Sequence, residues 1–292
     1  MSGTVSLRLP TGMPFAGAEV LEFIGGRAIA GIEWWDGVTY RRSMTLPGGH
    51  GTVTLRAADD HVAADLRLTD AGDLDMAVQR IRRLLDLDAD SAAVDAALSA
   101  EPVMAPLVAV RPGRRAPGSV DPFETSIRAI IGQQISVAGA RTVAASLVRA
   151  VGEPLDLDDP LLTHVFPSPA AVAVAPDAAF PMPTSRRDTL RRLAGAVADG
   201  DIVLDAGADP EATRAALLAV KGIGPWTADY ITMRGLSHPD IFLTSDLGVR
   251  HGLDQLVAAT GERPDPSRWA PWRSYAVHHI WAHLGARQET TP

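Results

Sequence analysis

The amino-acid sequence predicts an α+β fold, in which a small antiparallel sheet with helices precedes an all-helical region. From about Ala28 to Thr69, apolar and polar residues alternate and turn signals interrupt them, which is typical of short antiparallel strands. Beyond Asp121, apolar residues recur at the three- and four-residue intervals of amphipathic helices. We therefore expect an N-terminal α+β domain over residues 1–92 and helical subdomains after it.

Hairpin turns divide the N-terminal region. Turn signals stand at Asp36-Gly37, at Pro47-Gly48-Gly49 and at Asp59-Asp60, and they separate runs such as Thr52–Leu55 and Val62–Leu68. A helical spacing follows at Leu74, Ala77, Val78, Ile81, Leu84 and Leu85. Because these apolar positions share one side of a helix, we expect that side to pack on the sheet.

A stretch rich in Pro and Arg, from Pro102 to Pro117, indicates a connection between domains. We expect residues 93–120 to contain this connection together with part of a C-terminal helical subdomain. Asp121 to Glu124 then provide an N-cap, a first-turn Pro and a capping-box Glu. Further helical patterns cover about 185–198, 210–221, 225–234, 246–259 and 271–284. They predict one helical subdomain over 121–238 and another over 239–292.

The composition is that of an ordinary globular protein, with 292 residues of which 46% are hydrophobic. The chain has no cysteine, which excludes disulfides, thiolate zinc sites and iron-sulfur clusters. Neither a signal peptide nor a stretch of membrane-spanning length is visible, so we expect a cytoplasmic protein.

The net charge of −8 argues against coating nucleic acid by bulk electrostatics, but the charge is unevenly distributed. Residues 1–110 carry 9 basic and 15 acidic side chains, whereas residues 111–292 carry 18 and 20. The second part contains two arginine clusters, formed by Arg111, Arg114 and Arg115 and by Arg186, Arg187, Arg191 and Arg192. Each cluster is either a solvated helix face or a contact for phosphate.

A Gly-Ile-Gly turn separates two helical patterns. The first helix starts at the N-cap Asp209 and ends near Lys221. Gly222 and Gly224 allow positive φ and let another backbone come close. Pro225 then starts the second helix. The result is a helix-hairpin-helix whose free N–H groups attract an anion, with nucleic-acid phosphate the obvious candidate. The alternative is a plain helical hairpin in which the glycines only make a turn.

Two other glycine motifs fit this segment poorly. A dinucleotide-binding fingerprint needs a preceding strand and a third glycine, where this chain has a helical pattern and Thr227. A P-loop needs Gly-Lys-Ser/Thr, but Lys221 precedes the glycines.

The chain resembles the AlkA-type DNA-3-methyladenine glycosylases (glycosylase II) of the helix-hairpin-helix DNA glycosylase superfamily, over nearly its whole length. The resemblance rests on five blocks in order, which are Phe23–Ile29, Asp121–Ala138, Val220–Gly235, Phe242–Asp246 and Pro271–Trp281. It implies an N-terminal domain of TATA-binding-protein-like topology and an active-site cleft between two helical subdomains. It also implies a monofunctional enzyme of base excision repair that flips alkylated purines, such as 3-methyladenine and 7-methylguanine, from double-stranded DNA.

Asp246 stands at the position of the family's catalytic aspartate. An alkylated purine leaves readily because it carries positive charge, and a fixed carboxylate stabilises the oxocarbenium-like sugar or directs water to it, leaving an abasic site. The alternative is that Asp246 only caps the helix that runs on from Leu247. Both roles are compatible.

Related glycosylase-lyases place a catalytic lysine just after the hairpin, where this chain has Trp226. The only lysine is Lys221, before the hairpin, where we expect it to lie near phosphate. Without an amine to form a Schiff base, we expect no strand cleavage by β-elimination.

Aromatic residues in the matching blocks are expected to stack on the flipped, electron-poor base. They are Phe23, Trp226, Tyr230 and Trp281. Trp226 and Tyr230 are spaced to share one helix face, and the alternative for all four is core packing. Of the four, Phe23 is the residue for which packing in the core is the strongest alternative.

The resemblance places the wedge that fills the emptied duplex position at Gln134, where other members have an apolar residue. Ser245 and Leu247 also depart from the family pattern, which bears on substrate range. The positions expected to contact DNA are Lys221, Gly222, Ile223, Gly224, Thr227, Gln133, Gln134 and Arg250.

We expect no cofactor, no metal bound by side chains, and a monomer. His279 and His283 have a spacing that suits zinc, but no third ligand is evident. The resemblance allows a monovalent or similar cation held by hairpin backbone carbonyls.

Rival functions are a non-catalytic damage-binding protein on the same fold, in which Asp246 would be idle, and an oxidised-purine glycosylase-lyase. A small-molecule or nucleotide hydrolase lacks any phosphate-and-metal motif.

Overall fold

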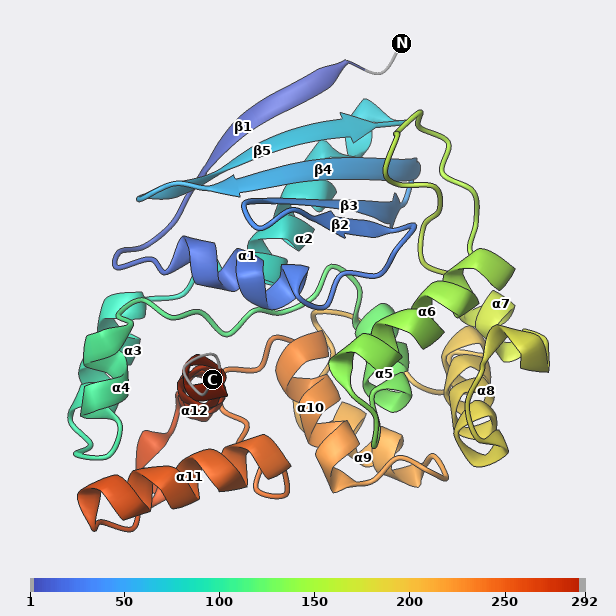
Figure 1. Ribbon diagram of the computed structural model, residues 1–292. Coiled ribbons are helices and arrows are strands. Elements are labelled where there is room, and N and C mark those ends of the chain that lie inside the picture. The colour runs from blue at the N-terminus through green and yellow to red at the C-terminus, as the bar shows by residue number, and fades with distance from the viewer. Residues whose placement is uncertain (1–2, 289–292) are drawn as a thin grey trace.

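The computed structural model describes residues 3–288 and confirms the α+β fold class (Figure 1). The sheet is antiparallel and five-stranded, in the order β1-β5-β4-β3-β2. Its strands are β1 (Thr4–Pro10), β2 (Glu33–Trp35), β3 (Thr39–Leu46), β4 (Gly49–Ala57) and β5 (His61–Leu68). The alternation expected over Val62–Leu68 is present in β5, where every second residue is buried.

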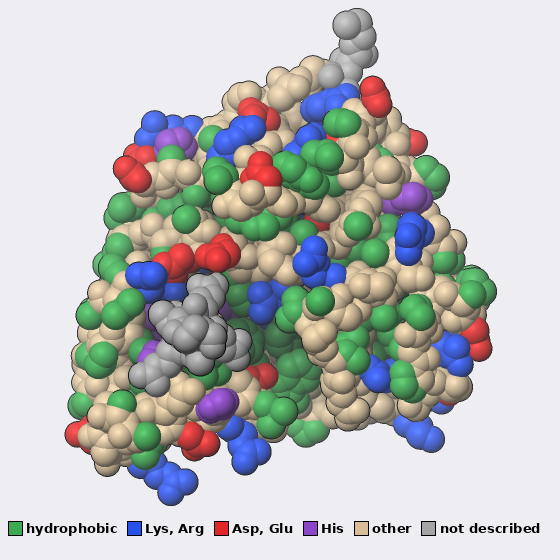
Figure 2. All heavy atoms as spheres, in the orientation of Figure 1, with side chains coloured by type: hydrophobic (Ala, Val, Ile, Leu, Met, Phe, Trp, Pro, Cys, Tyr) green, Lys and Arg blue, Asp and Glu red, His purple; other side chains and the backbone are tan. Residues whose placement is uncertain are grey.

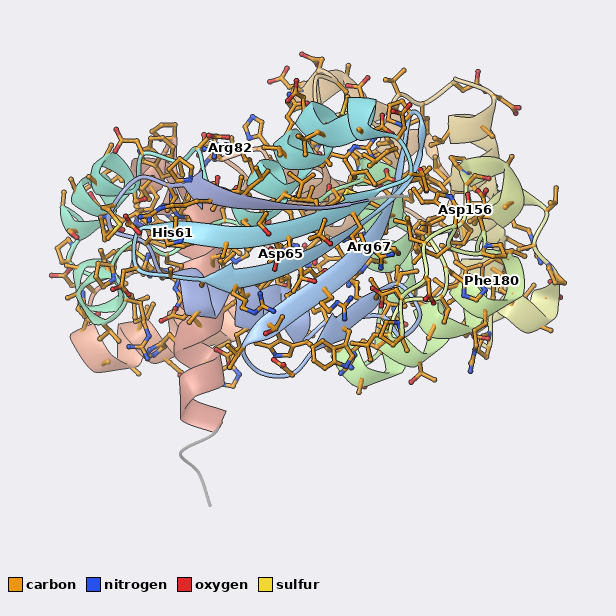
Figure 3. The ribbon with its side chains drawn as sticks, turned by 90° about the horizontal axis from the view of Figure 1, so that it is seen from above. His61, Asp65, Arg67, Arg82, Asp156 and Phe180 are labelled. Carbon is orange, nitrogen blue, oxygen red and sulfur yellow. The ribbon has the colours of Figure 1, made fainter. Side chains whose placement is uncertain are left out.

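One face of the sheet is covered by α1 (Gly17–Gly25) and α2 (Leu74–Leu85), which contribute Leu21, Ile81 and Leu85 to a shared core. The opposite face is polar. Figure 3, which views the molecule from above, shows His61, Asp65 and Arg67 along β5 on that face. The helices therefore lie between the sheet and the rest of the chain.

The sequence analysis did not predict β1 or α1. β1 is an edge strand paired only with β5, and only Leu9 of its residues is buried, although Val5, Leu7 and Leu9 alternate with polar residues in the sequence. The stretch Pro102–Pro117 was expected to be a connection but contains α4 (Ala105–Val110), with Leu107 and Val108 buried.

The helical region has two cores. The first gathers the middle of the chain, in α5 (Pro122–Ile131), α6 (Val137–Val151), α7 (Pro169–Ala173), α8 (Thr184–Ala198), α9 (Pro210–Ala219) and α10 (Pro225–Gly235). The second joins α3 (Ser91–Ser99) and α4 to α11 (Leu247–Thr260) and α12 (Arg273–Gln288). Residues directly after the N-terminal sheet and helices thus pack beside the C-terminal end of the chain (Figure 1).

Glu124 does not complete the expected capping box. Asp121 caps α5 by accepting the Phe123 N–H at 2.8 Å, as expected. Glu124 instead turns inward, where its two oxygens accept from Arg42 and Arg128, each at 2.8 Å. Two guanidinium groups attract this carboxylate more strongly than one backbone N–H.

This contact belongs to a buried ion network that joins the sheet to α5. Glu33, on β2, accepts from Arg128 at 3.0 Å and from the Tyr40 hydroxyl. Glu33, Arg42 and Glu124 are each at most 5% exposed. Burial alone would raise the pKa of Glu33, but Arg128 and Arg42 lower it below the usual value, so the carboxylate stays charged.

Arg42→Leu tests the network, because it leaves Glu33 and Glu124 with one guanidinium in place of two. We expect the free energy of unfolding in urea to fall by about 3–5 kcal/mol, the usual effect of breaking a buried pair. Arg8→Leu is the control, since its ion pair with Asp60 is exposed and should contribute little. Equal losses in the two variants would contradict the prediction.

Candidate active site

A cavity of about 450 Å³ lies between the two helical cores. Its walls come from α5, α6 and α10 on one side and from α11 and α12 on the other, with Arg27 and Ile29 after α1. Figure 2, drawn in the orientation of Figure 1, shows a hollow in the middle of the molecule's visible face, with hydrophobic side chains inside it. Of the residues expected at the active site, Trp226, Tyr230, Asp246 and Trp281 all line the cavity.

Asp246 is held by three hydrogen bonds. Its Oδ1 accepts from the Val249 N–H at 2.8 Å and from Trp281 Nε1 at 3.0 Å, and its Oδ2 accepts from Trp226 Nε1 at 2.8 Å. The first bond caps α11, so the capping role is present. The indole bonds fix the carboxylate plane at the cavity wall, where it remains half-buried. A fixed anion in this position can stabilise a cation inside the cavity.

The two indole donors were not foreseen from the sequence. Trp226 comes from α10 and Trp281 from α12, so Asp246 connects two walls of the cavity. A buried indole N–H usually has a hydrogen-bond acceptor, so the sequence could have predicted that each indole donates a bond. It could not have predicted that Asp246 is the acceptor. The Trp226 and Tyr230 rings stack at 5.3 Å between centroids, and Tyr230 lies 6.4 Å from Trp281. These three aromatic residues form one continuous group.

Phe23 does not line this cavity, in contrast to the sequence-based expectation. It packs behind Trp281, with ring centroids 6.3 Å apart and nearly parallel. Two guanidinium groups lie against the Phe23 ring, with Arg27 Cζ 3.8 Å and Arg234 Cζ 4.8 Å from the ring centroid. Phe23 supports the pocket from behind because α1 presents it to the core rather than to the opening.

The two glycines of the hairpin between α9 and α10 differ in backbone conformation and in the space around them. Gly222 has φ +100°, and a Cβ there would lie 2.0 Å from Thr189 Oγ1 on α8. Gly224 caps α10 with an ordinary φ of −96°, so the expectation of positive φ holds only for Gly222. No atom lies within 4 Å of a Cβ built at Gly224, which leaves that backbone open to approach. Ile223 is buried beneath the turn.

Gln133 and Thr227, both expected to contact DNA, bond to each other. Gln133 Nε2 donates to Thr227 Oγ1 at 2.9 Å and to the Gly222 carbonyl at 3.4 Å. Thr227 is only 3% exposed, so its side chain is not available to a ligand. Arg186 also donates to the Gln133 carbonyl, at 2.6 Å. These bonds attach the loop before α6 to the hairpin and to α8.

The other expected DNA contacts are exposed. Gln134 has φ +58° in the loop before α6, Lys221 lies at the hairpin, and Arg250 lies one turn after Asp246. Leu247, directly after Asp246, is 79% exposed. The sequence analysis did not place three arginines in the cavity wall, namely Arg27, Arg128 and Arg141.

Comparison with known proteins identifies the family. A family model described as the AlkA N-terminal domain matches residues 6–121. DNA-3-methyladenine glycosylase 2 of Escherichia coli is 35% identical over 275 residues, which cover 92% of this chain and 94% of that protein. The chain belongs to the AlkA family.

A probable bifunctional transcriptional activator/DNA repair enzyme AlkA of Mycobacterium tuberculosis is 44% identical over 286 residues. These residues are 97% of this chain but 58% of the relative, so the chain spans little more than half of that AlkA protein. The solved 3-methyladenine DNA-glycosylase from Archaeoglobus fulgidus shares the fold, with a TM-score of 0.80 at 18% identity, over 96% of this chain and 98% of that one.

Residues 3–288 hold no group of three or more His, Asp or Glu side chains suited to a metal ion. Nor does that part of the chain contain a helix long and apolar enough to cross a membrane. His279, one of the two histidines with zinc-like spacing, is 2% exposed in the second helical core. Burial and the nearby Arg114 charge lower the pKa of His279 to about 3.

His279 should make the protein less stable in acid. Its folded pKa of about 3 lies below the ordinary 6.5, so its contribution is present above pH 6.5 and is lost as the pH falls toward 3. In His279→Gln, the loss of unfolding free energy across this range should be smaller than in the wild type. Urea titrations at a series of pH values measure this, with the exposed His251→Gln as control. An unchanged pH slope in His279→Gln would refute the assignment.

Proposed function

We propose that the protein is a monofunctional DNA glycosylase of base excision repair. It flips an alkylated purine of the 3-methyladenine or 7-methylguanine type out of double-stranded DNA and hydrolyses the N-glycosidic bond, leaving an abasic site. The observation that supports this most directly is a carboxylate, Asp246, held by two indole N–H groups at the wall of an aromatic cavity.

Asp246 would act on the sugar. The purine leaves with the bonding electrons, and its methyl-derived positive charge makes it a good leaving group. The positive charge that then develops on the sugar is stabilised by the fixed carboxylate, and water attacks the anomeric carbon and releases a proton to Asp246 or to solvent. Oδ2 accepts only one of the three hydrogen bonds, so it retains a lone pair for the sugar or for that water.

The aromatic group would hold the flipped base. Trp226, Tyr230 and Trp281 offer π-faces to a cationic purine, each contact contributing roughly 0.5–2 kcal/mol. Because the alkylated base is positively charged and an ordinary base is not, this contribution favours the damaged one. Flipping costs a few kcal/mol of unstacking, and Gln134 at the exposed loop tip would fill the emptied position.

The hairpin would bind the DNA backbone. Gly224 is the N-cap of α10, whose N-terminus favours a phosphate, and exposed Lys221 adds a positive charge beside it. The Lys221 and Gly222 carbonyls already accept from Thr189 and Gln133, but each has a second lone pair. A cation held there is therefore compatible with the turn. We propose no other cofactor, and a monomer suffices for this site.

Asp246→Asn separates catalysis from folding. Asparagine keeps an oxygen for Val249 and Trp281, but its amide nitrogen cannot accept from Trp226. We expect release of 3-methyladenine and 7-methylguanine from methylated duplex DNA, measured by chromatography, to fall by at least about 10²-fold. The unfolding free energy should fall by only roughly 1 kcal/mol.

The control is Asp254→Asn, which removes an exposed carboxylate from the same helix. It should release bases at the wild-type rate. If the wild type releases no base from any alkylated substrate, or if Asp246→Asn matches it, the proposed activity is wrong. Damage-specific binding without release would then favour the non-catalytic rival.

A second test addresses the glycosylase-lyase rival. Trp226 occupies the position expected for a lyase lysine, and its indole is bonded to Asp246. We expect sodium borohydride to trap no protein-DNA adduct on alkylated or oxidised-purine duplexes, under conditions in which a known glycosylase-lyase is trapped. An adduct that disappears in Lys221→Arg would instead show that the chain's only lysine acts as a nucleophile.

A further inference from the structure

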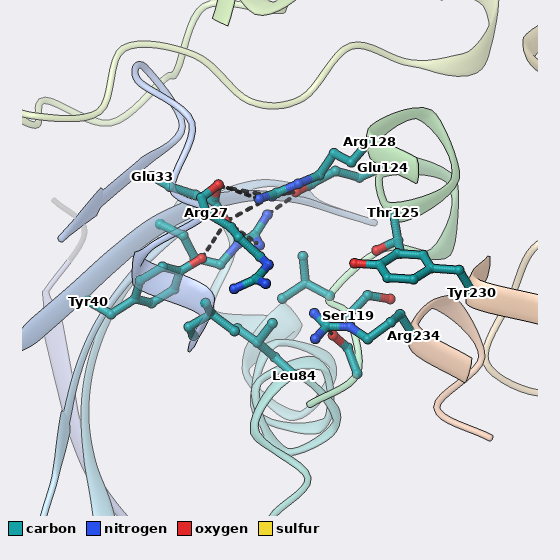
Figure 4. Close-up of a pocket in the computed structure, with 14 residues that line it drawn as sticks. Arg27, Glu33, Tyr40, Leu84, Ser119, Glu124, Thr125, Arg128, Tyr230 and Arg234 are labelled. Atoms are coloured by element: carbon teal, nitrogen blue, oxygen red, sulfur yellow. Dashed lines mark hydrogen bonds and ion pairs between the residues drawn. The ribbon is translucent and has the colours of Figure 1, made fainter. Parts of the chain in front are cut away.

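A second, smaller cavity of about 50 Å³ lies between the sheet and the helical region (Figure 4). Its charged lining consists of four arginines and two glutamates, namely Arg27, Arg42, Arg128, Arg234, Glu33 and Glu124. Arg42 and Arg128 are ion-paired with the two glutamates in the network described above. The lining therefore contains two more positive charges than negative ones.

Arg27 and Arg234 carry this surplus. Within residues 3–288 neither forms an ion pair with a carboxylate. Arg27 donates to the Phe23 carbonyl at 2.9 Å, and Arg234 donates to the Gly118 carbonyl at 3.2 Å. Arg234 is 7% exposed, and its Nε and Nη1 have no hydrogen-bond acceptor in the protein. A buried charge with unsatisfied donors is strongly unfavourable unless something compensates it.

The surplus charge persists at neutral pH. Burial, together with the charges of Arg27 and Arg128, lowers the pKa of Arg234, but only to about 10. The nearby Phe23 ring offsets part of the penalty through its π-face, since both guanidinium groups lie against it. That ring satisfies none of the unpaired N–H groups of Arg234.

We propose that this cavity is a binding site for a monoatomic anion of the size of chloride. Arg27 and Arg234 would supply the charge, and Figure 4 shows the Thr125 and Tyr230 hydroxyls facing the same space. The cavity exceeds the roughly 10–15 Å³ that one water needs, yet its small volume suits a single-atom anion better than a phosphate ester.

The site is distinct from the cavity of about 450 Å³ beside Asp246, hereafter the base cavity, but shares residues with it. Arg27, Arg128 and Tyr230 line both cavities. A bound anion would hold Arg27 and Tyr230 in place and so stabilise one wall of the base cavity. This inference does not rest on the proposed glycosylase activity, because its test measures anion binding and folding stability alone.

The test compares thermal unfolding in sodium chloride and in sodium gluconate at equal ionic strength. Chloride should raise the Tm of the wild type saturably, by a few degrees on the order expected for a single bound ligand. Arg234→Met should remove the difference between the two salts. Arg8→Met, which removes an exposed guanidinium, should retain it.

Equal Tm values of the wild type in chloride and gluconate would overturn the proposal, as would a full chloride effect in Arg234→Met. Wild-type crystals soaked in sodium bromide provide a second measurement that does not depend on the variant's folding. An anomalous bromide peak between the Arg27 and Arg234 guanidinium groups would support the site. The absence of such a peak would overturn the proposal.

Discussion

The arrangement of the molecule depends on the buried ion network between β2, β3 and α5. Arg128 is its central residue, because it bonds Glu33 and Glu124 and also donates to the Arg27 carbonyl at 2.6 Å. The chain after α1 is thereby attached to α5. A second attachment comes from Arg141 on α6, which donates to the Ala28 carbonyl. Buried ion pairs of this kind add little net stability compared with apolar packing, but breaking one is strongly destabilising because it leaves an uncompensated buried charge. Here they determine where one wall of the base cavity lies.

The other walls meet at Asp246. Trp226 lies on α10 and Trp281 on α12, which packs in the second helical core, and both donate to the same carboxylate. The carboxylate also caps α11, so one side chain orders the start of a helix and joins two cores. A group restrained in three directions needs little reorganisation when charge develops beside it, which is the condition for electrostatic stabilisation of a transition state.

Local signals in the sequence predicted much of the fold, and the resemblance to the AlkA-type glycosylases pointed to Trp226, Tyr230, Asp246 and Trp281, which line the cavity. Asp121, Asp209 and Asp246 cap the helices they were expected to cap, and Pro225 starts α10. Contacts between distant residues were not predictable in this way. Glu124 has the local pattern of a capping box, but Arg42, 82 residues away, takes it into the core. Likewise the Gln133 bond to Thr227 joins residues 94 apart, and no spacing rule reveals it.

Lys221 at the hairpin has a consequence for the chemistry of the whole surface. Every other positively charged side chain except histidine is a guanidinium, which does not react with acylating reagents at neutral pH. Apart from the amino terminus, the protein therefore presents a single primary amine, and it stands at an exposed turn beside the start of α10. Acetylation or any amine-selective label would reach one side chain only, so a single modification would alter the charge at this turn and leave all the arginines unchanged.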